Sequence, residues 1–370
     1  MPFYFSFFKI GGKKLSGSTY QGKQVDFSLS AFLNQKFQQY FEQDFQKKTG
    51  LLGYLVRSDN QLNYFAFHQV SSNPKANVVL GLNNHLIERN YLKSANRTVI
   101  NNQIKLLQIT STLKKLQASL KSDGIGFLLI ISPNKPSFYP ESIPAWYRVV
   151  GSESRYDSRE FMIAELKKQN INFIDGFSFL KEKEAEFDEP MFATSGTHWN
   201  ELGGCFAASE ILRKSAEILK KPLPKIECQI SGKRHRPAYQ DMDLLRIANL
   251  WMPELLMSKA PNVVSVTSME KGTQLPQLLI IGSSFCWELL RQFEQSKSTA
   301  KTEFLYYFKR RIVNSADKGR ELDPITFNYK NATQTKDMVI IEINQSFLKR
   351  AGFGFPESYL KWRELSAPLK

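Results

Sequence analysis

One stretch of the sequence decides the fold: Leu278-Leu279-Ile280-Ile281-Gly282-Ser283-Ser284-Phe285. Four aliphatic residues in a row predict a buried strand of the parallel type, and the residues that follow predict a helix over 287–293. A serine on such a strand-to-helix turn is how several hydrolase folds expose a nucleophile. Glycine permits the sharp backbone, and the helix N-terminus can hold an oxyanion. The alternative is an ordinary strand end at which Ser283 or Ser284 caps the helix.

The second informative stretch is Ser195-Gly196-Thr197-His198-Trp199-Asn200. Asn200 can cap the helix that we expect over 201–220. A histidine in the loop before a helix can accept and return a proton near neutral pH. The alternative for His198 is a ring satisfied by the backbone of an ordinary loop. A serine turn and a histidine loop in one chain are more specific than either alone, and together they predict a nucleophile and its base.

The remaining pattern alternates strands with helices. Periodicity predicts strands over 126–131, 171–174 and 338–345, and helices over 101–121 and 159–169. This alternation predicts an α/β fold in which a mostly parallel sheet is sandwiched by helices. We expect the chain to divide as follows: an N-terminal helical segment over 1–72, the α/β domain over 73–358 and a C-terminal tail over 359–370.

Two polar residues, Asn134 and Lys135, follow the strand at 126–131. Ligands in open α/β sheets gather at the carboxyl ends of strands, so these residues are candidates for substrate binding or oxyanion support. The alternative is a plain turn. Earlier in the chain, two apolar runs around Asn83-Asn84 predict a β-hairpin over 78–88, in which His85 has a structural place.

The 370 residues carry a net charge of +15, with 42% hydrophobic residues. Such a balance suits a nucleic acid, an anionic membrane surface or an acidic polymer as partner. The densest basic run, Lys233-Arg234-His235-Arg236, has no interleaved aromatic residues and no recognised nucleic-acid motif. We therefore expect an anionic glycan or envelope surface and no nucleic acid. No nucleotide-binding glycine loop is present, so no cofactor is predicted.

The three cysteines, Cys205, Cys228 and Cys286, lack CxxC spacing and imply neither a zinc site nor a full disulfide framework. We expect Cys205 and Cys286 to be small buried apolar residues. The first ten residues are apolar but too short to span a bilayer, and they lack the charged region and cleavage site of an export signal. They therefore give no clear signal peptide and leave a cytoplasmic location open.

Residues 75–355 resemble the alginate O-acetyltransferase group related to AlgX and AlgJ, whose catalytic domain is SGNH-hydrolase-like, with a flavodoxin-like sheet. The resemblance rests on the hairpin and on four further motifs: Ser132-Pro133-Asn134-Lys135, Gly196-Thr197-His198-Trp199, Gly282-Ser283-Ser284-Phe285 and Ile341-Glu342-Ile343-Asn344-Gln345. Here the histidine precedes the serine, whereas ordinary members of the wider superfamily have the reverse order. The order found here is that of the acetyltransferase group.

The resemblance implies that Ser284 takes up an acetyl group with His198 as general base, and that a polysaccharide hydroxyl then receives it. The polymer could be acidic or neutral. A membrane-bound acyltransferase would supply the acetyl group, and the location would be periplasmic or associated with the cell envelope. The residues expected to bind substrate or support the oxyanion are Asn134, Lys135, Ser283, Thr197 and Trp199.

The chain departs from the family pattern at two positions. The family usually has Asp-x-His-Trp and Gly-Asp-Ser, whereas Gly196 and Ser283 stand at the two Asp positions here. The orienting acid could come from Asp243 or Asp241, and next from Glu342; a backbone carbonyl could orient the ring instead; or catalysis could be lost. The chain is accordingly expected to be an O-acetyltransferase or acetylesterase, with a cationic glycan-binding module or an unrelated cytoplasmic α/β protein as alternatives.

Overall fold

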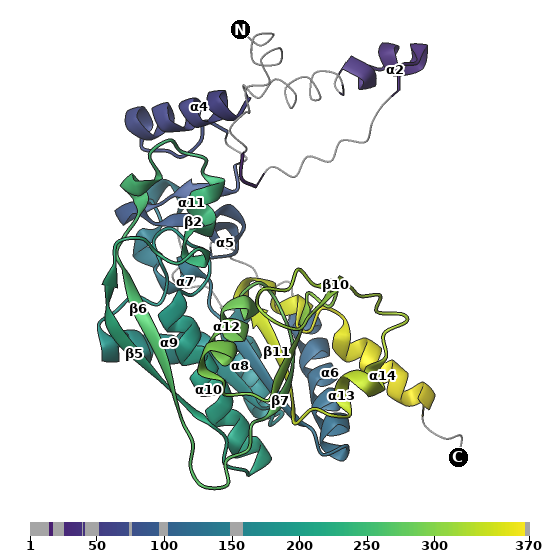
Figure 1. Cartoon of the computed structure of the whole chain (residues 1–370). Coiled ribbons are helices and arrows are strands. Elements are labelled where there is room, and N and C mark those ends of the chain that lie inside the picture. The colour runs from purple at the N-terminus through teal and green to yellow at the C-terminus, as the bar shows by residue number, and fades with distance from the viewer. Residues whose placement is uncertain are drawn as a thin grey trace.

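The computed structural model describes residues 15–17, 26–38, 40, 52–73, 76–95, 103–148 and 158–366. Its centre is a seven-stranded sheet with the order β10-β9-β8-β7-β11-β3-β4 (Figure 1). The bounds of these strands are β3 Gly126–Ser132, β4 Phe173–Asp175, β7 Gln277–Gly282, β8 Lys301–Tyr306, β9 Arg310–Ile312, β10 Arg320–Glu321 and β11 Met338–Asn344. The five strands from β8 to β4 pair in parallel, and β9 and β10 are antiparallel. The predicted mostly parallel sheet is confirmed.

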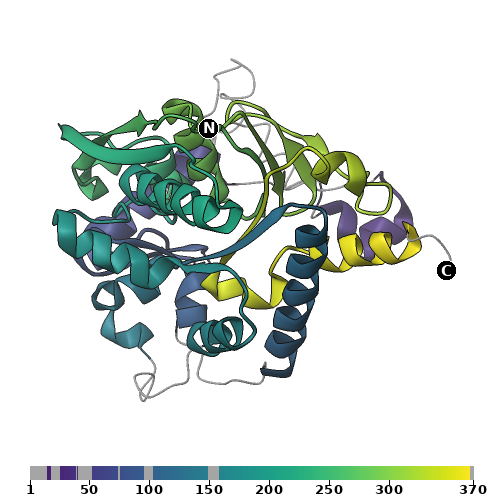
Figure 2. The same ribbon diagram turned by 90° about the horizontal axis from the view of Figure 1, so that it is seen from below.

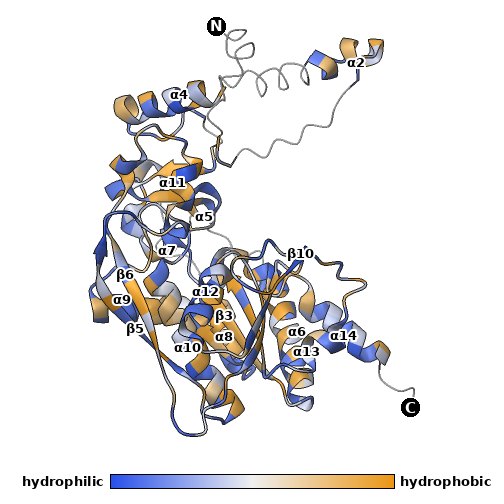
Figure 3. Ribbon diagram, in the orientation of Figure 1, coloured by the Kyte–Doolittle hydropathy of each residue, from blue (hydrophilic) through white to orange (hydrophobic). Residues whose placement is uncertain are grey.

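The central strands are aliphatic on both faces and therefore need helices on both faces. Along β7, Leu278 and Ile280 pack in one core cluster, while Leu279 and Ile281 pack in the other. The covering helices are α6 Gln103–Ser122, α8 Ser158–Lys168, α9 Gly176–Phe187, α10 Glu201–Leu219, α12 Cys286–Ser296 and α14 Phe355–Ser366. Helices α9, α10 and α12 cover the first face and α6, α8 and α14 the second, as Figure 2 shows from below. The apolar strands lie inside this sandwich (Figure 3).

Most of the predicted elements are present with bounds shifted by one or two residues. The long helix expected over 101–121 is α6, along which Leu106, Leu113, Leu116 and Leu120 are buried and Leu107 is 42% exposed. The predicted hairpin is also present: β1 Val78–Leu80 pairs antiparallel with β2 Leu86–Glu88 around a short 3-10 helix, Leu82–Asn84.

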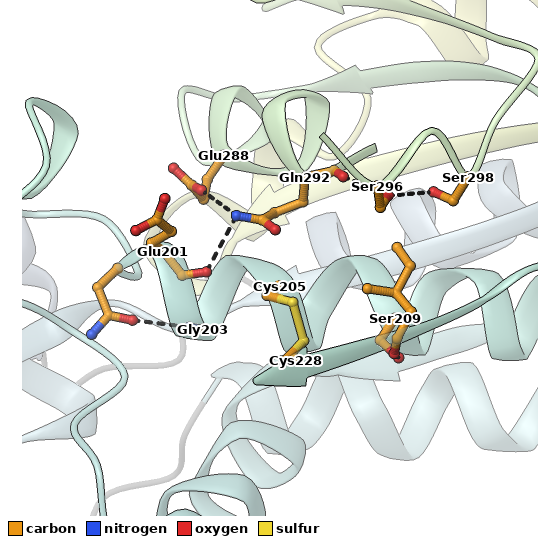
Figure 4. Close-up of a disulfide and its surroundings, with 11 residues drawn as sticks. Glu201, Gly203, Cys205, Ser209, Cys228, Glu288, Gln292, Ser296 and Ser298 are labelled. Atoms are coloured by element: carbon orange, nitrogen blue, oxygen red, sulfur yellow. Dashed lines mark hydrogen bonds between the residues drawn. A yellow bond between two sulfur atoms is a disulfide. The ribbon is translucent and has the colours of Figure 1, made fainter. Parts of the chain in front are cut away.

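A second antiparallel ribbon was not predicted. Strand β5, Lys225–Arg234, pairs with β6, Ala260–Ser268. Cys228 on β5 forms a disulfide with Cys205 on α10 (Figure 4). Cys205 is buried, as expected, but it is part of a disulfide that the sequence did not indicate, because the ribbon brings the two Cα atoms to 6.0 Å. Cys286 is free and buried, as expected.

The N-terminal segment contains the helices α2 Leu29–Leu33 and α4 Leu52–Phe67. Helix α4 contacts the domain through polar side chains: Asn60 donates a hydrogen bond to the Ala248 oxygen, and Gln61 accepts one from the Trp251 amide. The apolar stretch over the first ten residues lies outside the described part of the chain. Among the helices that are described, none combines the length and the hydropathy needed to cross a membrane.

The tail that we expected over 359–370 begins inside α14. Tyr359 is fully buried and stacks on Phe355 with ring centroids 5.9 Å apart, within the core cluster that also contains α6. The last turns of α14 are therefore part of the domain, because apolar and aromatic residues continue at helical spacing past residue 358. Residues 367–370 lie outside the description.

We predict that Tyr359→Ala lowers the free energy of unfolding by about 3 kcal/mol or more, because truncating a buried aromatic side chain leaves a cavity. Urea denaturation measures this loss. The matched control is Lys361→Ala, an exposed position on the same helix, which should change stability by less than about 0.5 kcal/mol. Equal effects of the two substitutions would contradict the placement of α14 in the core.

Candidate active site

Three side chains meet at the carboxyl edge of the sheet. Ser284 follows β7, His198 lies just before α10, and Asp243 begins α11, Asp243–Ile247. The Ser284 Oγ atom is 2.7 Å from His198 Nε2, and His198 Nδ1 is 2.8 Å from Asp243 Oδ2. They line a hollow of about 540 Å³. The arrangement has a nucleophile, a base and an acid that orients the base, in the order that serine acyl transfer requires.

Asp243 is held in place by backbone groups as well as by the imidazole. Its Oδ1 accepts hydrogen bonds from the amides of Thr197 (2.9 Å) and Leu244 (2.7 Å). Burial alone would raise the pKa of Asp243, but the hydrogen bonds from His198 and the two amides hold it below its usual value. The carboxylate is therefore ionised at neutral pH, as an acid that stabilises an imidazolium must be.

The geometry explains why position 196 carries no acid. A Cβ atom at Gly196 would lie 2.9 Å from the backbone oxygen of Asp241, so the segment that delivers Asp243 fills the space beside the loop. Ser195 fixes this contact: its Oγ donates to the Asp241 oxygen at 2.6 Å, and its own carbonyl oxygen accepts from the Leu245 amide at 3.1 Å. Of the acids that the sequence offered, Asp243 is the one that contacts His198.

The other two candidate acids lie elsewhere. Asp241 is buried, and burial followed by the charges of Glu288 and Glu201 raises its pKa to about 8. Figure 4 shows Glu201 and Glu288 on α10 and α12, joined by Gln292, whose Nε2 donates to Glu288 Oε1 at 2.9 Å. Asp241 is therefore protonated at neutral pH and is not an orienting carboxylate.

Glu342, at the end of β11, holds the serine turn. Its Oε2 accepts 2.7 Å hydrogen bonds from both the amide and the hydroxyl of Ser283, and its Oε1 accepts from Ser132 Oγ. Burial raises the pKa of this carboxyl. Only glycine fits at position 282, because a Cβ atom there would lie 2.3 Å from Cys286 Sγ. The Ser283 side chain is thereby committed to Glu342, so its expected contact with substrate is wrong.

Lys135 has a different place from the one expected. It is fully buried, and its Nζ, with three N–H donors, lies within hydrogen-bond distance of four carbonyl oxygens: Leu86 (2.9 Å), Ala193 (2.7 Å), Thr194 (2.7 Å) and Gly196 (2.8 Å). Burial lowers the pKa of this amine to about 7. Since all its donors are used, the expectation that it binds substrate or an oxyanion is wrong. It holds the loop that carries His198.

Three further residues that we expected to bind substrate contact neighbouring protein groups: Asn134, Thr197 and Trp199. Asn134 caps the short helix α7, Lys135–Phe138, by accepting from the Ser137 amide at 2.8 Å. The Trp199 ring is buried and packs edge-on against Phe285 with centroids 5.2 Å apart. Thr197 contributes its amide to Asp243, as described above. The expected substrate contact of the Asn134 side chain is therefore wrong, because it is buried and hydrogen-bonds with Ser137 and Ser346. Trp199 is among the residues that line the hollow, so its contact with substrate stays a prediction.

Tyr307 is the residue at this edge that the sequence did not suggest. It directly follows β8, the strand beside β7; burial raises the pKa of its hydroxyl, and interactions with the backbone N–H and side chain of Ser284 oppose that rise. Its backbone is in the left-handed region at φ 51°, which a tyrosine seldom adopts without a tertiary reason. We did not assign the run Thr302-Glu303-Phe304-Leu305 as a strand. Had we done so, a polar residue shortly after its end would have been a candidate for this edge of the sheet.

The wall of the hollow combines aromatic rings with two arginines and three acids: Arg246, Arg291, Asp243, Glu288 and Asp317. The Arg246 guanidinium stacks on Tyr239 at 3.6 Å, and Tyr239 is 63% exposed. Arg291 pairs with Glu288 at 2.8 Å, beside Trp287. Within the described residues no cluster of three His, Cys, Asp or Glu side chains has the geometry to hold a metal ion.

Residues 91–325 match the family model of the SGNH hydrolase-like domain of the acetyltransferase AlgX. The chain belongs to this family. Membership confirms the predicted SGNH-hydrolase-like fold class and the suspected relationship, and it makes the interpretation as an unrelated α/β protein wrong. The AlgX family is one of O-acetyltransferases, so the chain is of an enzyme class. No curated protein matches the sequence.

Solved structures similar to the chain include three bacterial proteins. The O-acetyltransferase domain of Pseudomonas putida AlgJ has 16% identity and a TM-score of 0.48, covering 74% of this chain and 92% of that one. Pseudomonas aeruginosa AlgX has 14% identity and a TM-score of 0.46, covering 76% of this chain and 66% of its own. Bacillus cereus PatB1, with a sulfonyl adduct, has 12% identity and a TM-score of 0.42, covering 73% and 97%. Membership rests on the family match and not on these likenesses.

We predict that Asp243→Asn lowers kcat for an activated acetyl ester by about 10³- to 10⁴-fold, because the amide no longer stabilises the imidazolium or fixes its tautomer. Asp241→Asn is the matched control, two residues away on the same segment. Since Asp241 is protonated at neutral pH, the amide closely replaces it, and kcat should change by less than about tenfold. Similar losses in both variants would show that the segment, and not the Asp243 carboxylate, matters.

Proposed function

We propose that this protein is an O-acetyltransferase that modifies a bacterial envelope polysaccharide through an acetyl-Ser284 intermediate. The observation that carries the proposal is the relay from Ser284 Oγ to His198 Nε2 (2.7 Å) and from His198 Nδ1 to Asp243 (2.8 Å) in a chain of an acetyltransferase family. A serine is a weak nucleophile until a neighbouring imidazole takes its proton.

The first half-reaction acetylates the serine. His198 Nε2 takes the Ser284 proton as Oγ attacks the acetyl carbonyl carbon, and the bond from that carbon to the donor's leaving atom breaks. The leaving group takes the proton back from His198. In the second half-reaction a sugar hydroxyl gives its proton to His198 and attacks the same carbon. The Oγ–carbon bond breaks, and Ser284 recovers its proton.

Charge that develops on the carbonyl oxygen needs donors close to Ser284. The backbone N–H of Ser284 lies on the turn that Glu342 holds rigid, and the Tyr307 hydroxyl is close enough to that N–H and to Oγ for both to influence its pKa. We assign the oxyanion to this N–H and the Tyr307 O–H, with the incoming carbonyl oxygen replacing the contact between them. Donors fixed before the reaction need no reorganisation during it.

The acceptor that the hollow suits is an acidic polysaccharide. The Arg246–Tyr239 pair offers a guanidinium for a carboxylate and an exposed ring for the face of a sugar, whereas Arg291 is already paired with Glu288. The net charge of +15 favours the same polymer class through long-range attraction. Transfer to water would make the protein an acetylesterase with the same acyl-enzyme.

We place the protein in the periplasm, where a membrane-bound acyltransferase would present the acetyl donor. Family membership supports this location. So does the disulfide between Cys205 and Cys228, because disulfides persist in oxidising compartments and are rare in the cytosol. The disulfide joins α10, which begins beside His198, to the β5–β6 ribbon.

The alternative function is a non-catalytic, cationic glycan-binding module, and the net charge is the observation that favours it. The two functions differ in what Ser284 contributes. A binding module would retain salt-sensitive affinity for an acidic glycan in Ser284→Ala and would show no turnover in the wild type.

We predict that wild-type protein hydrolyses p-nitrophenyl acetate and that both Ser284→Ala and His198→Ala lose this activity, by about 10³-fold or more, because each removes a member of the relay. Release of p-nitrophenol measures the rates. The matched control is Ser315→Ala, which lines the same hollow but makes its hydrogen bonds to Glu294. Equal background rates in wild type and all variants would favour the binding module.

We predict that protein recovered from an oxidising compartment carries one free thiol. Denaturation in iodoacetamide without a reductant should modify a single cysteine, Cys286, and prior reduction should expose all three. Peptide mass mapping identifies the modified positions. Three free thiols in unreduced protein would count against the disulfide and against the proposed location.

A further inference from the structure

A second hollow of about 560 Å³ lies at the same edge of the sheet. It is on the α14 side, lined by residues at the end of β8, by the 3-10 turn Gln345–Arg350 that follows β11, and by the loop that leads into α14. The hollow that contains Ser284 is on the α12 side. Strand β7 lies between β8 and β11 in the sheet, so Ser284, which follows β7, lies between the two hollows.

Tyr307 connects the second hollow to the nucleophile. Its ring lines the hollow and packs edge-on against Phe353 with centroids 5.0 Å apart, while its hydroxyl is close enough to Ser284 for that residue to influence its pKa. A ligand in the second hollow would therefore lie against the other side of the residue that touches Oγ. This continuity distinguishes it from the larger hollow at the opposite edge, which contacts none of the relay residues.

The charge of the second hollow is strongly positive. Lys309, Lys349 and Arg350 line it, with Glu357 as the single acid among its lining residues. All three cations are exposed, and none has a carboxylate within 4 Å among the residues that the structure describes. Exposed basic side chains around a concave surface, without acidic partners of their own, suit an anionic ligand.

The walls of the hollow add aromatic surface to this charge. Phe347 joins Tyr307 and Phe353 in the lining, and its ring contacts Tyr91 with centroids 5.8 Å apart. Apolar walls with a few charged groups are the usual composition of a specific ligand site. Rings suit the apolar faces of sugar units, and the cations suit carboxylates. The combination fits an acidic sugar better than a bare phosphate, which needs no aromatic walls.

We propose that this basic hollow, formed around Lys349 and Arg350, is a second acceptor subsite that binds a uronate unit of the same polysaccharide chain. One glycan chain then passes over Ser284. Its acidic units lie in the two hollows, and the acceptor hydroxyl lies between them, next to Ser284. The proposal rests on the proposed function for its substrate. It extends the recognition of that substrate to residues on the far side of Tyr307.

The test is a titration of the full chain, without any acetyl donor, with hexamers of galacturonate and of mannuronate and with maltohexaose as the neutral probe. Wild type should bind at least one of the acidic hexamers, more weakly as salt rises, and should bind maltohexaose far less tightly. Lys349→Glu and Arg350→Glu should each weaken the acidic hexamer by about tenfold. The matched control is Lys114→Glu, the same charge change at the opposite edge of the sheet, which should leave Kd within about twofold of wild type.

Several outcomes would overturn the subsite. They are no binding of either acidic hexamer, equal Kd values for Lys349→Glu, Arg350→Glu and wild type, equal losses in Lys114→Glu, or tighter binding of pyrophosphate than of the hexamers. Thermal unfolding of each variant checks that the fold is retained. Lys349→Glu and Arg350→Glu test the same hollow independently of each other.

Because no donor is present, the titration is independent of acetylation. Wild type that binds but never becomes acetylated refutes the proposed function, whereas acetylation with unchanged binding in Lys349→Glu refutes the subsite alone.

Discussion

A Cβ atom at position 196 would lie 2.9 Å from the backbone oxygen of Asp241, and this lack of space shapes the whole site. The segment that fills the space is held against the histidine loop by the Ser195 hydroxyl and carries Asp243 to within 2.8 Å of His198 Nδ1. The acid that the family pattern has two residues before the histidine is thus supplied by a segment more than forty residues later. The functional requirement is a carboxylate beside the imidazole, not a particular sequence position.

Two buried ionisable side chains, Lys135 and Glu342, hold the loops that carry His198 and Ser284. Lys135 gathers carbonyl oxygens from β2 and from the histidine loop, and Glu342 gathers the amide and hydroxyl of Ser283. A buried carbonyl group left without a partner costs about 1–3 kcal/mol, so each charged group fixes a loop that would otherwise be costly to order. Neither reaches the substrate. By fixing the loops that carry His198 and Ser284, the two residues keep the reacting side chains in the geometry that catalysis by proximity requires.

The sequence predicted the features that depend on local pattern. Continuous aliphatic runs identified β3, β7 and β11 because strands buried on both faces carry no polar alternation, and the turn residues after them pointed to Ser284. Features that depend on contacts between distant segments were less accessible. Asp243 was preferred among three acids, but nothing local to it shows that it contacts His198. Lys135 was expected at the surface of the site because nothing local marks its burial. The disulfide needed the β5–β6 ribbon, which we did not predict although polar and apolar residues alternate along the start of β5.

The central claim is that Ser284, activated by His198 and Asp243, carries the acetyl group. The most direct measurement is intact-mass spectrometry of wild-type protein after brief exposure to an activated acetyl ester and an acid quench, followed by peptide mapping. The account predicts one added acetyl group, located on Ser284 and lost again when an acceptor glycan is supplied before the quench. No adduct on Ser284, or acetyl groups only on exposed lysines, would contradict it.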